Sequence, residues 1–151
     1  MTDIRPAHLE DAPALTALAL RSKAHWGYDD AFLAACVPGL TIDDAVLGAG
    51  PAFVAGDDAA NGFVAMDLAG PDGAEVTHLF VDPPAIGSGV GRRLWDRAVG
   101  AALLAGAPSV VVEADPNAAG FYRRLGAQPI GERPSSAAPD RTLPLLRIVL
   151  D

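Results

Sequence analysis

The chain has 151 residues, half of them apolar and a fifth charged, and its 19 acidic and 11 basic residues give a formal net charge of −8. This composition is typical of one globular domain and not of a disordered chain. The acidic balance, without a cluster of cations, argues against a nucleic-acid binder. The single cysteine, Cys36, excludes an intrachain disulfide and a multi-cysteine metal site.

The start of the chain lacks the basic-then-apolar layout of a signal peptide. No apolar stretch approaches the roughly 20 residues of a membrane span. We therefore expect a soluble cytoplasmic protein without a membrane partner. Lys23 is the only lysine beside many arginines, alanines and glycines, which is typical of a GC-rich bacterial genome.

Helical and strand patterns alternate along the chain. In the first half we predict a strand at residues 4–5, helices at 11–23 and 29–38, and a short helical turn within 41–47. Strands at 52–56 and 62–68 form a predicted hairpin, and a turn at 70–73 leads into a strand at 75–82. The second half is predicted to contain a helix from residue 90 to 105, a strand at 109–114, a helix capped by Asp115 with Pro116 at its first position, and strands at 127–132 and 143–150.

Residues 79–95 carry the most specific signal. An apolar run stops at two prolines, glycines follow at positions 87, 89 and 91, and an amphipathic helix begins on the last of them. The first turn of a helix leaves amides without internal partners and carries the positive end of the helix dipole. Glycines let an anion approach these amides, so the loop is predicted to hold a phosphate, with Arg92 or Arg93 adding positive charge.

The glycines allow two other interpretations. They could form a simple flexible turn, although the following helix is amphipathic from its first residue. They could also belong to a dinucleotide site, with Glu113 as the ribose-binding acid at the end of a strand. The Gly-x-Gly-x-Gly spacing and the four residues between strand and glycines argue against that site.

A second motif follows about thirty residues later, at residues 115–126, where an asparagine precedes a Phe-Tyr pair and a Leu-Gly helix end. The two motifs in this order resemble the GCN5-related N-acetyltransferases, which bind acetyl-coenzyme A. The resemblance covers nearly the whole chain. It implies an α/β (α+β) fold of the acyl-CoA N-acyltransferase type, in which helices flank a mixed, mostly antiparallel central sheet, as one domain over residues 1–151.

The resemblance also implies where acetyl-CoA binds. One position departs from the family pattern, because Ile86 stands where a Gln or Arg is usual, although the backbone amide remains. Asn117 matches the residue that holds the pantetheine arm, or it caps a helix start. The predicted cofactor-binding residues are Leu79, Phe80, Val81, Ile86, Gly87, Ser88, Gly89, Val90, Gly91, Arg92, Asn117 and Phe121.

Acetyl transfer to an amine needs a base for the ammonium and an acid for the departing thiolate. The resemblance assigns the acid to Tyr122, whose alternative role is core packing. Glu75 is the candidate base, directly or through water, and is alternatively an exposed carboxylate after a turn. Strand alternation places Glu75 on one face with Leu79, and His78 on the other face as a structural histidine.

The acceptor site is predicted around residues 23–30, with Trp26, Tyr28 and Asp29, together with Glu113. An acidic and aromatic loop suits a small cationic amine. The same aromatic residues could instead anchor a helix pair to the sheet. A protein N-terminus or side chain as acceptor, and a non-catalytic acetyl-CoA sensor, stay open, as does a homodimer. No metal ligand set is predicted.

Overall fold

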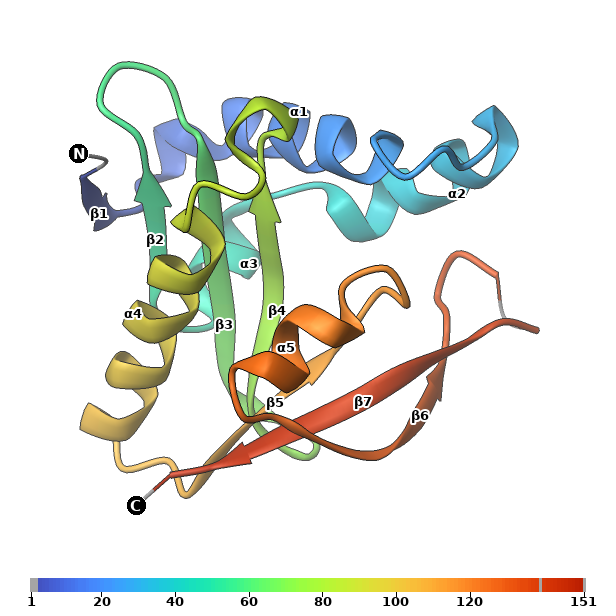
Figure 1. Cartoon of the computed structure of the whole chain (residues 1–151). Coiled ribbons are helices and arrows are strands. Elements are labelled where there is room, and N and C mark those ends of the chain that lie inside the picture. The colour runs from blue at the N-terminus through green and yellow to red at the C-terminus, as the bar shows by residue number, and fades with distance from the viewer. Residues whose placement is uncertain (1–2, 139, 151) are drawn as a thin grey trace.

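The computed structural model describes residues 3–138 and 140–150. Seven strands form one sheet in the order β1-β2-β3-β4-β5-β7-β6, and every neighbouring pair is antiparallel except β4 and β5 (Figure 1). The strands are β1 Ile4–Pro6, β2 Ala52–Ala55, β3 Gly62–Gly70, β4 Gly73–Val81, β5 Ser109–Glu113, β6 Gln128–Pro134 and β7 Thr142–Val149. This mostly antiparallel sheet confirms the predicted fold class.

Five α-helices of the described chain pack on the two faces of the sheet. They are α1 Ala12–Ala24, α2 Asp30–Leu40, α3 Asp44–Gly48, α4 Val90–Leu104 and α5 Ala119–Arg124, with 3₁₀ turns at Leu9–Asp11 and Pro83–Ala85. None of the helices within the described ranges has the length and apolar character needed to cross a bilayer.

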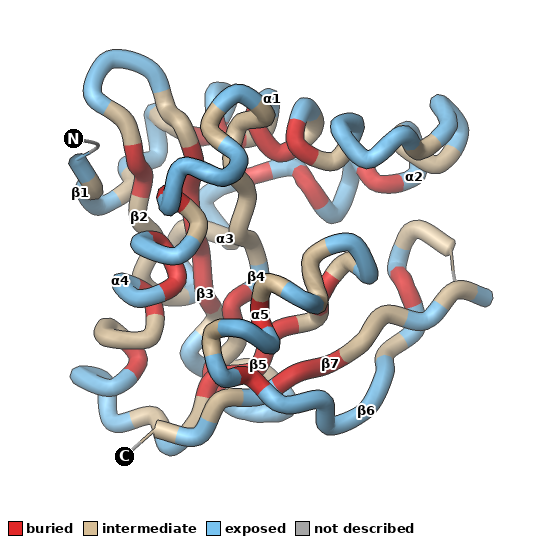
Figure 2. Tube along the Cα trace, in the orientation of Figure 1, coloured by how far each residue is buried: buried red, intermediate tan, exposed pale blue. Residues whose placement is uncertain are grey.

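Two hydrophobic cores lie on opposite faces of the sheet. Val64 of β3 belongs to the core under α4, while its neighbour Phe63 belongs to the core under α1. Successive residues of a strand point to opposite faces, so a strand covered on both sides is apolar at every position. In Figure 2 the buried part of β3 accordingly runs as a continuous stripe at the centre of the molecule.

Strand β4 contains a bulge that the sequence pattern did not reveal. Ala65 pairs with His78 and Met66 pairs with Val76, which leaves Thr77 without an opposite residue on β3. One extra residue reverses the faces on either side of it. The prediction that Glu75 shares a face with Leu79 is therefore wrong: Leu79 packs in the core with Val76, and Glu75 points to the opposite side.

Helix α5 begins later than predicted. Its N-cap is Ala118, and the helix runs from Ala119 instead of starting at Pro116. The Asp115 carboxylate accepts a hydrogen bond from the Asn117 amide at 2.8 Å, which folds a local turn in front of the helix. The Asp115 side chain therefore does not cap α5, and its carboxylate also contacts Lys23 and Tyr28.

Candidate active site

A cavity of about 590 Å³ opens where β4 and β5 separate. The two strands pair in parallel over only three residue pairs, the last being Val76 with Val112. Both of these residues line the cavity, as does Leu79 further along β4. Beyond the last pair, the edges of β4 and β5 diverge and leave a slot with apolar walls and backbone groups.

The glycine loop forms one end of this cavity. Gly87 and Gly89 adopt φ values of 84° and 91°, a left-handed conformation that strongly favours glycine. Gly89 is the N-cap of α4 and has no side chain to cap the helix. Arg93 is the first α4 residue whose amide has an internal acceptor, Gly89 O at 3.1 Å. The amides before it present partial positive charge at the cavity.

The absence of a side chain at Gly91 lets α4 approach α5 closely. A Cβ there would lie 3.3 Å from Phe121 Cζ and 3.4 Å from Val81 Cγ2, tighter than ordinary contacts for the first of these. Phe121 also lines the cavity. The third glycine of the motif is thus explained by packing, and the first two by backbone conformation.

Most of the predicted cofactor-binding residues meet at this cavity. Ser88 does not line it, because its hydroxyl donates to Ala85 O within the loop. Val90 is buried in the core beneath α4. The predicted residues that line the cavity are Leu79, Phe80, Val81, Ile86, Gly87, Gly89, Gly91, Arg92, Asn117 and Phe121.

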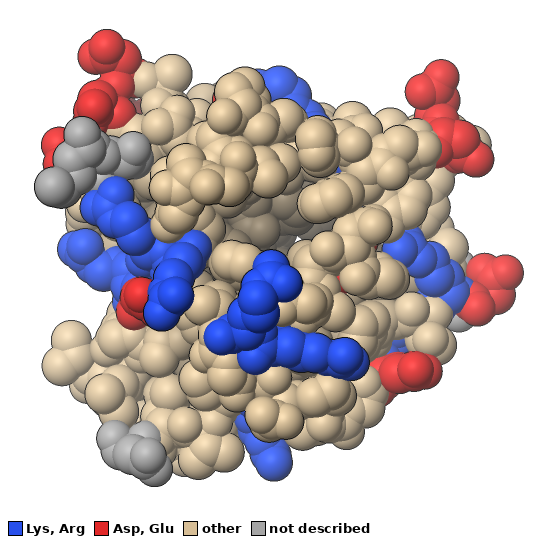
Figure 3. Space-filling view, in the orientation of Figure 1, with Lys and Arg blue, Asp and Glu red and all other residues tan. Residues whose placement is uncertain are grey.

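Basic side chains surround this end of the cavity. Arg92 of α4 and Arg124 of α5 both line it, although only Arg92 was expected. Figure 3 shows Lys and Arg side chains gathered over α4 and α5 beside the hollow of this face. In a chain of net charge −8, a local excess of cations favours an anionic ligand here.

Tyr122 lies at the floor of the cavity. The residue is only 5% exposed, and its ring packs against Trp95 and Phe121 at centroid distances of 5.3 and 5.1 Å. Burial raises the pKa of Tyr122, so the phenol stays protonated far above neutral pH. The side chain is therefore held as a neutral proton donor within the walls of the cavity.

Two glutamates lie close to Arg133 of β6. Arg133 Nη1 donates to both carboxylate oxygens of Glu75, at 3.0 and 3.1 Å, and Nη2 donates to Asp72 at 2.6 Å. Glu113 Oε2 lies 3.7 Å from the same Nη1. Glu113 lines the cavity whereas Glu75 does not. Burial raises the pKa of Glu113, and the neighbouring Glu75 adds to this rise, while Arg133 opposes it.

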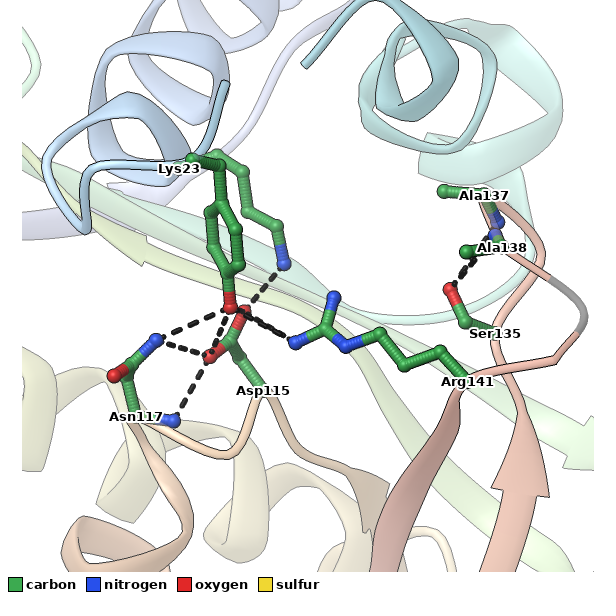
Figure 4. Close-up of polar contacts among 8 residues, drawn as sticks. Lys23, Asp115, Asn117, Ser135, Ala137, Ala138 and Arg141 are labelled. Carbon is green, nitrogen blue, oxygen red and sulfur yellow. Dashed lines mark hydrogen bonds and ion pairs between the residues drawn. The ribbon is translucent and has the colours of Figure 1, made fainter. Parts of the chain in front are cut away.

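A second polar cluster joins three segments at the cavity wall (Figure 4). Asp115 accepts from Lys23 Nζ at 2.5 Å and from the Tyr28 hydroxyl at 2.8 Å. Asn117 Nδ2 and Arg141 Nη2 both donate to the Tyr28 oxygen, at 3.1 and 2.9 Å. The cluster ties the α1–α2 loop to the β5–α5 segment and to the β6–β7 loop.

The β6–β7 loop is shaped to present Arg141. The Ser135 amide donates to Arg141 O at 2.7 Å, and the Ser135 hydroxyl accepts from the amides of Ala137 and Ala138 at 3.2 and 3.3 Å. Ser135 is itself buried. This turn fixes the backbone of the residue that reaches Tyr28 (Figure 4).

The remaining candidate residues take different places. Trp26 lines the cavity, while Tyr28 stands behind the wall in the polar cluster. The Asp29 carboxylate caps α2 by accepting from the Phe32 amide at 2.8 Å. His78 Nε2 lies 3.1 Å from Gly39 O, and burial lowers the pKa of His78, as suits a neutral structural histidine.

Sequence analysis does not identify Arg133 and Arg141 of these clusters as site residues, and it includes Lys23 only as the first residue of the predicted acceptor segment 23–30. Each meets its carboxylate or phenol from a segment 58 to 113 residues away. No local motif marks such pairs. Within the described part of the chain, no three metal-ligating side chains come together.

Solved structures with this architecture are numerous. A GCN5-related N-acetyltransferase from Rhodopseudomonas palustris superposes with a TM-score of 0.81 at 24% identity, over 99% of this chain and 96% of that one. The PaiA N-acetyltransferase of Thermoplasma acidophilum, solved with coenzyme A, gives 0.80 at 15% identity, over 99% of both chains. The ribosomal-protein-S18-alanine N-acetyltransferase of Escherichia coli gives 0.72 at 16% identity, over 99% and 94%.

Sequence comparison adds an independent finding. No curated protein matches the chain. The family model of the acetyltransferase (GNAT) domain matches residues 51–137, which is more than half of the chain and includes both motifs. The predicted family is thereby confirmed: the chain belongs to the GNAT acetyltransferases.

Proposed function

We propose that this chain binds acetyl-CoA in the cavity between β4 and β5 and transfers the acetyl group to a primary amine of a small molecule. The observation that carries the proposal is the N-terminus of α4, where Gly89, Gly91 and Arg92 line the cavity together with Arg124 of α5. Free amides and two guanidinium groups suit phosphates, and the apolar slot suits a thioester arm. Three of the solved structures with this fold are complexes with coenzyme A or acetyl-CoA.

Bound acetyl-CoA supplies an activated acyl group, so the protein has to position the amine and move two protons. Tyr122 is the proposed general acid for the departing thiolate. The residue lines the cavity, and burial keeps its phenol protonated. Its packing against Trp95 holds the ring in one place.

The geometry favours Glu113 over Glu75 as the base. Both oxygens of Glu75 accept from Arg133 Nη1, so its carboxylate is engaged in an ion pair, and Glu75 does not line the cavity. Glu113 lines the cavity, and burial raises its pKa. A carboxylate with a raised pKa, within reach of the acceptor, is the better proton acceptor at neutral pH.

Trp26 and Lys23 belong to the wall of the same cavity and mark the side from which an acceptor enters. Asp29 was predicted to contact the acceptor, but its carboxylate is engaged at the start of α2. We therefore assign recognition of the ammonium to Glu113, with the indole of Trp26 as an adjacent aromatic surface.

The proposal is tested by incubating purified protein and acetyl-CoA with small primary amines or with peptides that have a free N-terminus. Release of the free thiol of coenzyme A is the measurement. Turnover with small amines and not with peptides supports the proposed acceptor class. Turnover with peptides alone favours a protein substrate. Binding of acetyl-CoA by calorimetry without turnover of any acceptor favours the sensor.

A further inference from the structure

Arg133 is shared unequally among three carboxylates. It lies on β6, an outer strand of the sheet, with its side chain 22% exposed. Its two terminal nitrogens make hydrogen bonds of 2.6 to 3.1 Å with Asp72 and Glu75, whereas the nearest oxygen of Glu113 is 3.7 Å away. The guanidinium is thus close to Glu113 but directs its hydrogen bonds elsewhere.

This unequal sharing matters for a base. A bidentate grip by arginine stabilises a carboxylate and weakens its affinity for protons. Without any nearby cation, burial and the neighbouring Glu75 would shift Glu113 further toward its protonated form, which cannot act as a base. Glu113 lies between these extremes, because the guanidinium is near but its short hydrogen bonds go to Glu75 and Asp72.

We propose that Glu75 and Arg133 are positioning residues: the nearby Arg133 guanidinium keeps Glu113 ionised, and Glu75, by engaging that guanidinium, prevents Arg133 from pairing fully with Glu113, so that Glu113 can accept the proton of the amine. The inference rests on the proposed role of Glu113 as base. It gives Glu75, the carboxylate predicted to be catalytic, a function without contact to the acceptor. Asp72 assists by engaging the second nitrogen of Arg133.

The charged groups around Glu113 come from several elements. Arg133 belongs to β6, Glu75 to β4 and Lys23 to α1, and all three influence the Glu113 carboxylate. The charge of Lys23 is already balanced by Asp115 at 2.5 Å. Burial and Glu75 raise the pKa of Glu113, and Arg133 and Lys23 lower it. Changes at Glu75 and Arg133 should therefore have opposite effects.

The decisive measurement is a titration of Glu113 in the ligand-free protein by NMR, with ¹³C-labelled glutamate and the Glu113→Gln variant to identify the resonance. Glu75→Gln removes a negative neighbour and frees Arg133 to pair with Glu113, so the titration should move to lower pH. Arg133→Gln removes the nearby cation, so the titration should move to higher pH. Arg147→Gln, an exposed arginine on β7, is the matched control and should leave it in place.

Rate measurements then connect the titration to turnover. The acidic limb of the pH profile of kcat/KM should move in the same direction as the NMR titration in each variant. The inference would be overturned if the Glu113 titration did not move in Glu75→Gln and Arg133→Gln, or if it moved in the same direction in both variants. The two variants could instead shift the Glu113 titration in opposite directions while the acidic limb of the kcat/KM profile stays in place. That result would support the electrostatic arrangement but reject Glu113 as the base, so failure of this inference and failure of the proposed function can be told apart.

Discussion

The Tyr28 hydroxyl donates to Asp115 Oδ2 at 2.8 Å, across 87 residues of sequence. Tyr28 lies after α1, and Asp115 lies after β5 at the opening between the strands. The same carboxylate binds Lys23 Nζ. One side chain therefore fixes the loop that carries Trp26 against the segment that carries Asn117, and both Trp26 and Asn117 line the cavity.

Replacement of Asp115 by Asn tests that contact. The variant loses the ion pair with Lys23 and leaves a partly buried ammonium without its charged partner, so we expect the free energy of unfolding to fall by about 1–3 kcal/mol at neutral pH. Denaturant unfolding with far-UV circular dichroism measures it. Asp30→Asn, in the exposed first turn of α2, is the control and should change little.

The destabilisation in Asp115→Asn should depend on pH. Burial alone would raise the pKa of Asp115, but hydrogen bonds from Lys23, the Asn117 amide and Tyr28 hold the pKa below its usual value of 3.8. The ionised carboxylate thus stabilises the fold above the unfolded-state pKa, and this contribution disappears as the pH falls through the folded-state pKa. A difference between parent and variant that stays constant down to pH 2 would contradict this role.

Gly89→Glu should abolish binding of acetyl-CoA. The new carboxylate stands at the amides of α4 that are proposed to hold phosphate, and it repels the anion. Gly106→Glu is a close control, because Gly106 follows the other end of α4, has a φ of 85° against 91°, and also offers open space for a Cβ. Both variants carry a similar strain of about 1–2 kcal/mol, so only the binding heat in calorimetry should separate them.

Arg92→Gln and Arg124→Gln should each weaken acetyl-CoA binding. A hydrogen bond to a charged group is worth about 1.5–3 kcal/mol, which corresponds to a Kd roughly ten to a hundred times higher. Arg93→Gln is the comparison, because Arg93 neighbours Arg92 on α4 but does not line the cavity. Equal losses in all three variants would point to general charge attraction instead of direct contacts.

Tyr122→Phe should lower kcat by about 10²–10⁴-fold while the affinity for acetyl-CoA stays unchanged. The ring and its packing on Trp95 remain, so the melting temperature should be close to that of the parent. Because burial raises the pKa of Tyr122, the parent should show no loss of rate from its ionisation near neutral pH. A variant as fast as the parent would restrict Tyr122 to a packing role.

The parts of this molecule that could be predicted are those with local signals. The glycine loop and α4 follow from three glycines and a helical apolar period within one short segment, and the structure places them as expected. The bulge at Thr77 has no such signal, since one strand residue more or less leaves the apolar pattern of β4 nearly unchanged. That single residue decides which way Glu75 points.

The polar clusters around Arg133 and Asp115 could not be predicted from the sequence, for a different reason. Arg133 and Glu75 are 58 residues apart, and neither residue alone marks a pair. Asp115 was expected to cap α5, because Asp-Pro is a common start of a helix. Lys23 and Tyr28 both donate to this carboxylate in the folded chain, and only the tertiary structure brings these two residues to it.

The pairing of β5 with β7, and not with β6, has a consequence for the order in which the molecule becomes functional. Arg133 and Arg141 both belong to the hairpin that β6 and β7 form, and this hairpin docks on β5 through β7. During synthesis, the glycine loop and α4 emerge well before this hairpin. Both polar clusters can therefore be completed only after the residues of this hairpin have been made.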